Sequence, residues 1–301
     1  MENYSIHLPS YSIGDKVYNK IPEICETYGK KIIAIGGHKA INAAREKIDK
    51  PVFSFPTIAS NCSACTSVSI MYYPDGRFKE PFFYPAPPVH AFIDTEITVN
   101  SPSRYLWAGM GDTYAKYFEA EMSSKGEELQ HYFQMGVNAS RMCYEPIMKY
   151  GKAAMDSNDR KQNSYEYEQV VLAIIVSTAV ASIYLTAEHT VHYNSGLAHA
   201  IFYSLTAHPH IEKNHLHGEV VSYGVLNLLL VDNNMEDFET VYKFNKSVGL
   251  PTCLKDLEFT KDNIEQLAEN AVIMKDIQHN PYVITKEMLI TSMEKLEELN
   301  K

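Results

Sequence analysis

Three short stretches of the sequence contain side chains that could bind a metal ion together. Asp112 follows two glycines in the stretch GMGD, His199 lies in the apolar stretch GLAHAIFYSLT, and His215 and His217 come just before the apolar run GEVVSYGVLNLLLV. One carboxylate and two imidazoles suit Zn²⁺ or Fe²⁺, and three protein ligands leave one coordination position open. An ion in such an open site can polarise the oxygen of an alcohol or carbonyl substrate.

Each of these residues also has a simpler structural interpretation. The two glycines let the backbone approach a neighbour closely, and Asp112 could be the N-cap of a helix formed by TYAKYFEAEM. A single histidine such as His199 on an apolar helix face is usually a core residue. The spacing of 86 residues and then 17 residues between Asp112, His199 and His217 is too loose to be a motif by itself.

The first hundred residues must form a sheet that lies beside this site. Lys31–Ile35 and Pro51–Phe55 read as strands, with a Gly-Gly turn and a helix at Lys39–Ile48 between them. This order is typical of a parallel α/β sheet. Ser67–Tyr73 and Phe78–Tyr84 flank Asp-Gly, which predicts a hairpin.

After a last short strand at Ala91–Ile93, ending at Asp94, the apolar period changes from two to about 3.6 residues. The sequence therefore predicts an α/β domain over residues 1–101 and an all-helical domain over residues 102–301. A final helix is expected at Lys286–Leu299, and Val170–Leu185 reads as a buried core helix, too short to span a bilayer. One predicted inward face contains Tyr132, Met135, Ala139, Met142 and Cys143.

Composition excludes several classes of protein. With 45% hydrophobic and 21% charged residues the chain is an ordinary globular protein, and its net charge of −10 argues against a nucleic-acid partner. The first residues, MENYSIHLPSYSIG, do not read as a secretion signal. Five unevenly spread cysteines do not make a disulfide framework, so a reduced cytoplasmic protein is expected, with no membrane partner.

Several stretches, taken together, resemble the glycerol dehydrogenase branch of the iron-containing alcohol dehydrogenase family. They are FPTIASNCSACTSVSIMYYPDGRF, FIDTEI, SRYLWAGMGDTYAKYFEA, GLAHAIFYSLT and HLHGEVVSYGVL, and they cover roughly residues 51–245 in order. The resemblance implies a Rossmann-like parallel sheet followed by an all-α domain, as in the dehydroquinate synthase-like and glycerol dehydrogenase-like folds. It also implies a homo-oligomer.

In that family the corresponding Asp and two His residues bind the metal, which here are Asp112, His199 and His217, whereas His215 matches no ligand position. Iron-using members have a further histidine one helical turn after the aspartate, and here that residue is Lys116. The resemblance therefore favours Zn²⁺, with Fe²⁺ as the alternative. The 17 residues between the two histidines also fit the glycerol dehydrogenase branch.

The resemblance further implies NAD or NADP, with Thr57, Ser60 and Ser67 as cofactor contacts. At the position where glycerol dehydrogenases have an Asp that contacts the polyol, this chain has Cys62, as the hydroxycarboxylate dehydrogenases of the family do. Without that carboxylate an anionic substrate is no longer repelled, which favours a 2-oxo acid or simple carbonyl compound over glycerol. A redox or zinc role for Cys62-x-x-Cys65 is the less favoured interpretation.

One departure from the family pattern concerns the phosphate-binding loop. Only one glycine turn, Gly36-Gly37, is visible, and relative to the two turns of the family about 60 residues look absent. This turn corresponds to the earlier of the two, and one hypothesis is that it has taken over the pyrophosphate. Since no acidic residue follows it to bind a ribose, and His38 and Lys39 would suit a 2′-phosphate, NADP is as compatible as NAD.

Three functions follow from these features. The leading one is a metal-dependent oxidoreductase that transfers a hydride between NAD(P) and an alcohol or carbonyl substrate, such as a polyol, a 2-oxo acid or a 2-hydroxy acid. The second is a non-catalytic remnant that binds metal but no dinucleotide. The third is a lyase or dehydratase that uses the metal alone.

Overall fold

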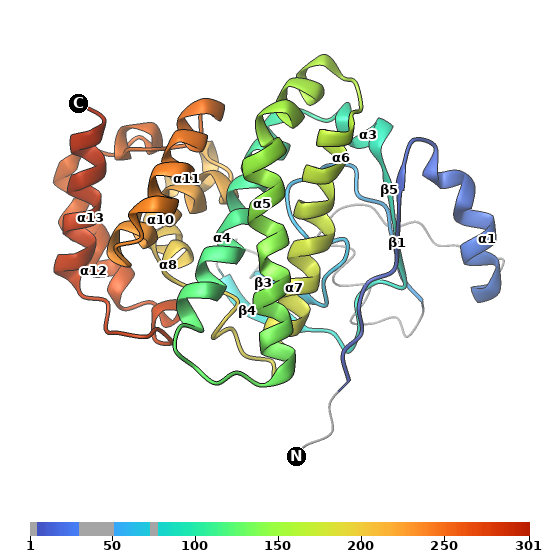
Figure 1. Ribbon diagram of the computed structural model, residues 1–301, viewed down its shortest axis with the longest axis horizontal. Helices are drawn as coiled ribbons and strands as arrows, with labels where there is room; N and C mark the ends of the chain where they lie inside the picture. The colour runs from blue at the N-terminus through green and yellow to red at the C-terminus, as the bar shows by residue number, and fades with distance from the viewer. Residues whose placement is uncertain (1–4, 30–50, 73–77) are drawn as a thin grey trace.

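A computed structural model describes residues 5–29, 51–72 and 78–301 of the chain (Figure 1). Within these residues a small sheet lies at one end of the molecule and a large group of helices makes up the rest. The strands are β1 Tyr11–Gly14, β2 Phe53–Ser54, β3 Val68–Tyr72, β4 Phe78–Phe83 and β5 His90–Asp94. The principal helices are α1 Ile21–Cys25, α3 Thr95–Val99, α4 Ser103–Ser123, α5 His131–Arg160, α6 Tyr165–Leu172, α7 Thr178–Leu185, α8 Leu197–Thr206, α9 Pro209–Asn214, α10 His217–Val231, α11 Met235–Val248, α12 Ile264–Val272 and α13 Lys286–Leu299. A π-helical turn, η3, spans Ala173–Ser177, and short 3-10 helices occupy Val17–Lys20, Glu26–Tyr28, Leu254–Leu257, Lys261–Asn263 and Lys275–Ile277.

The described part of the main sheet is parallel, with strand order β1-β5-β2. All five residues of the central strand β5 are buried. Both ring nitrogens of His90 on this strand are hydrogen-bonded, Nδ1 to Oγ of Ser10 just before β1 at 2.7 Å and Nε2 to Oγ of Ser12 in β1 at 3.0 Å. The strands predicted at Pro51–Phe55 and Ala91–Ile93 are confirmed, the first as the shorter β2 and the second as the slightly longer β5. The strand β1 was not predicted, because none of its four residues is buried and they carry no clear alternation.

The predicted hairpin is confirmed as β3 and β4, which pair antiparallel. The predicted strand Lys31–Ile35, the helix Lys39–Ile48 and the Gly36-Gly37 turn lie outside the described residues.

Asp94 turns the chain from the sheet into the helices. Its carboxylate caps α3, accepting the backbone N–H groups of Glu96 at 3.0 Å and Ile97 at 3.3 Å. The long helix α4 begins soon afterwards at Ser103, and Asn158 at the end of α5 donates to the carbonyls of Val99 at 2.5 Å and Ser101 at 3.1 Å. This fully buried amide fixes the connection between α3 and α4 onto α5.

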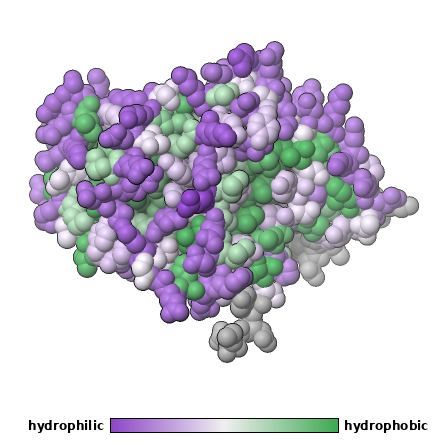
Figure 2. Space-filling model, viewed as in Figure 1, coloured by the Kyte–Doolittle hydropathy of each residue, from purple (hydrophilic) through white to green (hydrophobic). Residues whose placement is uncertain are grey.

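The predicted core helix forms part of a longer one. The segments α6, η3 and α7 run continuously over Tyr165–Leu185, which makes 21 residues, long and apolar enough to cross a membrane by length and composition. The segment packs against α5, and 67% of its apolar window is buried, so the prediction of a core helix is confirmed. Figure 2 shows apolar residues at the surface over the region that α6 and α7 occupy in Figure 1.

The buried face of α5 agrees with the predicted one at Tyr132 and Cys143 and differs from it at Met135 and Met142. Met135 and Met142 are 39% and 51% exposed, because the inward face runs instead through small and medium residues: Val137, Ser140, Cys143, Ile147, Gly151 and Ala154. Small side chains allow close helix packing there, which hydrophobicity alone does not reveal. The final helix α13 has the predicted bounds.

Candidate metal centre

The helix α4 carries Asp112, and it does not begin where the sequence suggested. It starts at Ser103, so the GMGD stretch lies inside the helix and Asp112 is a mid-helix residue. The alternative that Asp112 is an N-cap is therefore wrong. The two glycines allow the loop at Ala59 and the start of α10 at Gly218 to pack closely on α4.

The glycines of GMGD allow backbones to meet at van der Waals distance. A methyl group built on Gly109 would lie 2.7 Å from the carbonyl oxygen of Ala59, and one built on Gly111 would lie 2.2 Å from that of Gly218. Gly218 in turn approaches α4, since its own methyl group would lie 1.9 Å from the oxygen of Ala108. The start of α10, with His217 as its first residue, is thus pressed against the turn of α4 that carries Asp112.

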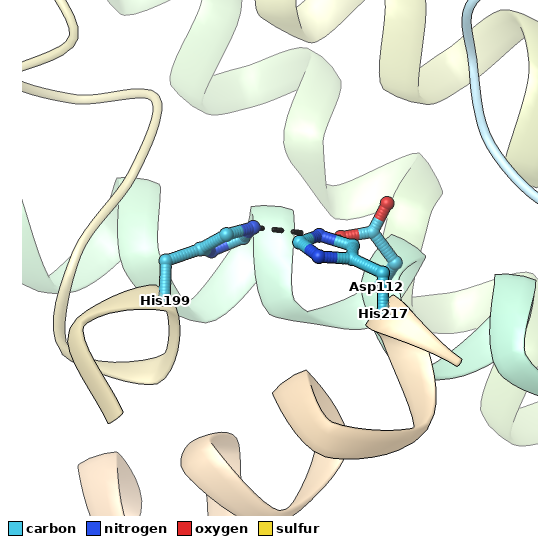
Figure 3. Close-up of side chains that lie close together, drawn as sticks. All are labelled: Asp112, His199 and His217. Carbon is cyan, nitrogen blue, oxygen red and sulfur yellow. Dashed lines mark ion pairs between the residues drawn. The ribbon is translucent and has the colours of Figure 1, made fainter. Parts of the chain in front are cut away.

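Three helices bring three side chains to one point (Figure 3). Asp112 comes from α4, His199 from the first turn of α8 and His217 from the start of α10. One donor atom from each lies within 4.8 Å of the other two. Asp112 Oδ1 is 3.6 Å from His199 Nε2 and 3.3 Å from His217 Nε2.

These separations fit a small divalent ion. Two ligand atoms that are each about 2.1 Å from a tetrahedral Zn²⁺ are about 3.4 Å apart. The carboxylate and two imidazole nitrogens are also the donor types that zinc accepts. The side chain of His217 is 44% exposed, while those of Asp112 and His199 are 17% and 12% exposed, so the cluster is open on the His217 side.

The charges of the site shift the pKa values of its members. Burial acts to raise the pKa of Asp112, but the charges and hydrogen bonds of His217 and His199 outweigh it and hold this pKa well below its usual range. Burial acts to lower the pKa of His199, yet Glu119 and Asp112 raise it to about 10. In the metal-free protein His199 therefore holds a proton that a metal ion would have to displace.

Cys62 lies in the loop between β2 and β3, close enough to Asp112 for that carboxylate's charge to affect the pKa of its thiol. Burial, and after it the charge of Asp112, raises the pKa of the Cys62 thiol to about 12. The thiol is therefore neutral at physiological pH. Cys62 and Cys65 are both free, and the backbone N–H of Cys65 donates to the carbonyl of Cys62 at 2.9 Å in a tight turn.

Three of the predicted cofactor contacts, Thr57, Ser60 and Ser67, lie in the same loop between β2 and β3. Ser60 lies against α4, because a methyl group on Gly109 would come within 3.0 Å of its Cα. Thr57 is exposed, and Ser67 immediately precedes β3, where its carbonyl accepts the backbone N–H of Tyr84 at 2.7 Å. Of the predicted cofactor residues, Ser60 thus packs on the helix that carries Asp112, while Gly36 and Gly37 lie outside the described residues.

Two further side chains beside the cluster were not predicted as site residues. Lys116, one turn after Asp112, is buried and directs its amine to Asn194, donating to the backbone carbonyl and, at 3.0 Å, to the side-chain oxygen. Glu119, two turns after Asp112, contacts the ring of His199. The only signal for Glu119 in the sequence is its spacing of seven residues from Asp112, which places both on one face of α4.

Comparison with known proteins gives the family. The chain is 32% identical over 288 residues to the glycerol dehydrogenase of Thermotoga maritima, an alignment that covers 91% of this chain and 76% of that enzyme. The chain belongs to the glycerol dehydrogenase family. It is also 27% identical over 277 residues to hydroxycarboxylate dehydrogenase A of Escherichia coli, covering 88% of this chain and 74% of the relative.

The fold agrees with this assignment. The crystal structure of a probable glycerol dehydrogenase from Sinorhizobium meliloti superposes with a TM-score of 0.81 at 20% identity, covering 99% of each chain. No family model matches the chain. The predicted fold class, a reduced parallel sheet followed by a helical domain of the glycerol dehydrogenase type, is confirmed, while the boundary at residue 101 stays a prediction.

Proposed function

We propose that the chain is a zinc-dependent oxidoreductase that transfers a hydride between NAD(P) and an alcohol or carbonyl compound. The observation that carries this proposal is the cluster of Asp112, His199 and His217, with one donor atom of each within 4.8 Å of the others, in a chain of the glycerol dehydrogenase family. Family membership favours this function over the non-catalytic remnant.

The three side chains suit a catalytic rather than a structural metal. Asp112 supplies an ionised carboxylate, and the two histidines each turn Nε2 toward it. Three protein ligands leave a position for the substrate, and the half-exposed His217 marks the side from which a small molecule can arrive. A bound divalent ion supplies Lewis-acid polarisation of the substrate oxygen, and the dinucleotide supplies or accepts the hydride.

Lys116 supports zinc over iron. It stands where the resemblance gives iron-using members a further histidine, and its amine is tied to Asn194 by two acceptors. A lysine ammonium has no lone pair to offer a metal. The site therefore offers three ligands from the described residues, which suits zinc, and iron is the second choice.

Cys62 supports a 2-oxo acid or simple carbonyl compound as the substrate in place of glycerol. Its thiol is neutral, because burial and Asp112 raise its pKa to about 12. A neutral side chain neither repels a carboxylate nor accepts the strong hydrogen bonds that an ionised aspartate would give a diol. The similarity to a hydroxycarboxylate dehydrogenase agrees with this choice.

For the dinucleotide we propose contacts with Ser60 first, and with Thr57 and Ser67 at the ends of the same loop. Ser60 has the best support because it packs on α4 beside the metal centre. The pyrophosphate is assigned to Gly36 and Gly37 on the sequence pattern alone.

Turnover measured at 340 nm tests the function. Zinc-loaded protein is mixed with NADH or NADPH and a panel of 2-oxo acids, aldehydes and polyols. The proposal expects dinucleotide oxidation with at least one 2-oxo acid or aldehyde, loss of this activity on chelation, and its return on addition of zinc. Zinc-loaded protein that neither binds a dinucleotide nor turns over any member of the panel would support the remnant instead.

A further inference from the structure

Glu119 is a fully enclosed carboxylate whose hydrogen bonds all go to the segment that carries His199. Its side chain is 0% exposed and comes from α4, two turns after Asp112. Its Oε1 accepts the backbone N–H of Gly196 at 2.9 Å and of His199 at 3.0 Å. Its Oε2 lies 2.8 Å from Nδ1 of the His199 ring.

The first pair of bonds makes Glu119 the cap of a different helix. The first N–H groups of any helix lack partners within it, and the residue before α8 is Gly196, which has no side chain to supply one. Glu119 takes that role from α4. A methyl group on residue 196 would lie 3.2 Å from the Cγ of Glu119, so the glycine also makes room for the carboxylate.

The third bond determines which nitrogen of His199 keeps its hydrogen when a metal ion displaces the other. A carboxylate offers only lone pairs, so the hydrogen in this contact is on Nδ1 of the ring. Nε2 is then the atom turned toward Asp112, at 3.6 Å. The same carboxylate thus places the backbone of His199, orients its ring and selects its tautomer.

Among the described residues, no carboxylate is bonded to Nδ1 of His217. Its ring packs edge-on against Phe202, with 4.3 Å between the centroids, and its side chain is 44% exposed. Of the two histidines, His199 is therefore the one whose Nδ1 is held by a carboxylate, and Glu119 provides it.

We propose that Glu119 is a positioning residue that presents Nε2 of His199 to the metal by capping α8 and bonding Nδ1 at the same time. The inference rests on the proposed function, in which His199 is a metal ligand. Carboxylates that hold a ligating histidine in this manner change metal affinity by about 10- to 100-fold when they are replaced. Glu119 touches neither the metal position nor the substrate, and acts through His199.

The variant Glu119→Gln separates the two tasks of the carboxylate. Glutamine has one acceptor oxygen and one NH₂ group. If the oxygen keeps the two backbone N–H groups, the NH₂ faces Nδ1 and forces the ring hydrogen onto Nε2, where the metal must bind. The variant then still caps α8, while Nε2 of His199 can no longer bind the metal. Glu121→Gln, two residues along α4 on an exposed side chain, is the matched control.

The test measures zinc affinity by competition with a chelator, together with the melting temperature of the zinc-free proteins. We expect Glu119→Gln to bind zinc about 10- to 100-fold more weakly than Glu121→Gln. The zinc-free melting temperature of Glu119→Gln should also be lower, because the carboxylate is the buried partner of the protonated His199 ring. Equal zinc affinities in the two variants would overturn the proposal.

A second measurement does not depend on the variants or on zinc. In ¹⁵N-labelled wild-type protein, His199 should show a slowly exchanging Nδ1–H proton resonance both with and without zinc. Absence of that resonance would overturn the positioning role. If the wild-type protein bound no zinc but showed the resonance, the proposed metal function would fail while the orientation of His199 by Glu119 would stand.

Discussion

Gly218 gives the sharpest way to test whether close contact between two helices builds the site. A methyl group on this residue would lie 1.9 Å from the carbonyl oxygen of Ala108 and 2.9 Å from the backbone nitrogen of Asp112. Both atoms belong to the backbone of α4, so no flexible side chain can move aside. Since ordinary contacts begin at 3.4 Å, the substitution Gly218→Ala has to separate the start of α10 from α4 by about 1.5 Å.

That displacement is large compared with the geometry of the site. His217 directly precedes Gly218, and its Nε2 is 3.3 Å from Asp112 Oδ1. Overpacking of this kind lowers the free energy of unfolding by about 1–3 kcal/mol. The higher helix propensity of alanine offsets up to about 1 kcal/mol of this loss. A misplacement of about 1 Å at an active site can lower the rate about 100-fold, so we expect kcat/KM to fall by about that factor and zinc binding to weaken with it.

Gly136→Ala on α5 is the matched control. Its methyl group would meet side-chain carbons of Leu185 at 2.8 Å, which is an overpacked contact away from the metal centre. Denaturant unfolding and zinc competition are measured on both variants. Both should lose stability, and only Gly218→Ala should lose zinc affinity and turnover. Unchanged zinc affinity in Gly218→Ala would refute the argument that the contact between α4 and α10 positions the ligands.

Three further outcomes follow from individual side chains. Because the pKa of His199 in the metal-free protein is raised to about 10, a zinc ion must displace its proton. The zinc affinity measured by calorimetry should therefore rise about tenfold per pH unit between pH 6 and 9. An affinity that does not change with pH would contradict the raised pKa of His199. Cys62→Asp places a second carboxylate near Asp112 and, if Cys62 contacts the substrate as proposed, should move the ratio of kcat/KM for 2-oxo acids to that for diols by at least about tenfold toward diols, measured at 340 nm. An unchanged ratio would remove Cys62 from the substrate site. Asn158→Leu leaves the carbonyls of Val99 and Ser101 without their buried donor. It should lower the free energy of unfolding, measured in urea, by about 1–3 kcal/mol. A change smaller than the error of the fit would show that the connection between sheet and helices does not depend on this amide.

Much of the candidate site could be predicted from the sequence because its three side chains lie in stretches with a specific resemblance. Asp112, His199 and His217 are separated by long intervals, and the structure brings them together from three helices. Spacing could not have done this, since the contact depends on how α4, α8 and α10 cross. The glycines were correctly expected to permit a close backbone approach, and the structure shows that the partners are Ala59 and Gly218.

The misses have a common physical origin. The helix start at Ser103 was missed because glycine normally weakens a helix, and here tertiary contact with α10 outweighs that preference. The inward face of α5 was misassigned because Met135 and Met142 look like core residues, while the helix packs through Ser140 and Gly151. In both cases small residues that allow close packing determine how the helix packs, and a pattern of hydrophobic residues does not reveal them.

Glu119 was missed for a different reason. An acidic residue in the middle of a helix usually faces solvent, and nothing local shows that this one is enclosed. Its partners, Gly196 and His199, lie 77 and 80 residues further along the chain. Only the packing of α4 against α8 shows that it meets a helix start and a histidine ring at once.

Zinc content per chain, measured after dialysis, tests the central claim most directly when wild type is compared with His217→Ala and His215→Ala. His215 is the matched control, since it lies two residues from His217 but its side chain is 8% exposed and bonded to Glu219 at 2.7 Å. We expect one zinc per chain in wild type and in His215→Ala. His217→Ala should retain much less, because losing a ligand lowers the affinity by more than the roughly 100-fold seen for residues that only support a ligand. Equal zinc retention in all three proteins, or none in wild type, would contradict the assignment of Asp112, His199 and His217 as the metal centre.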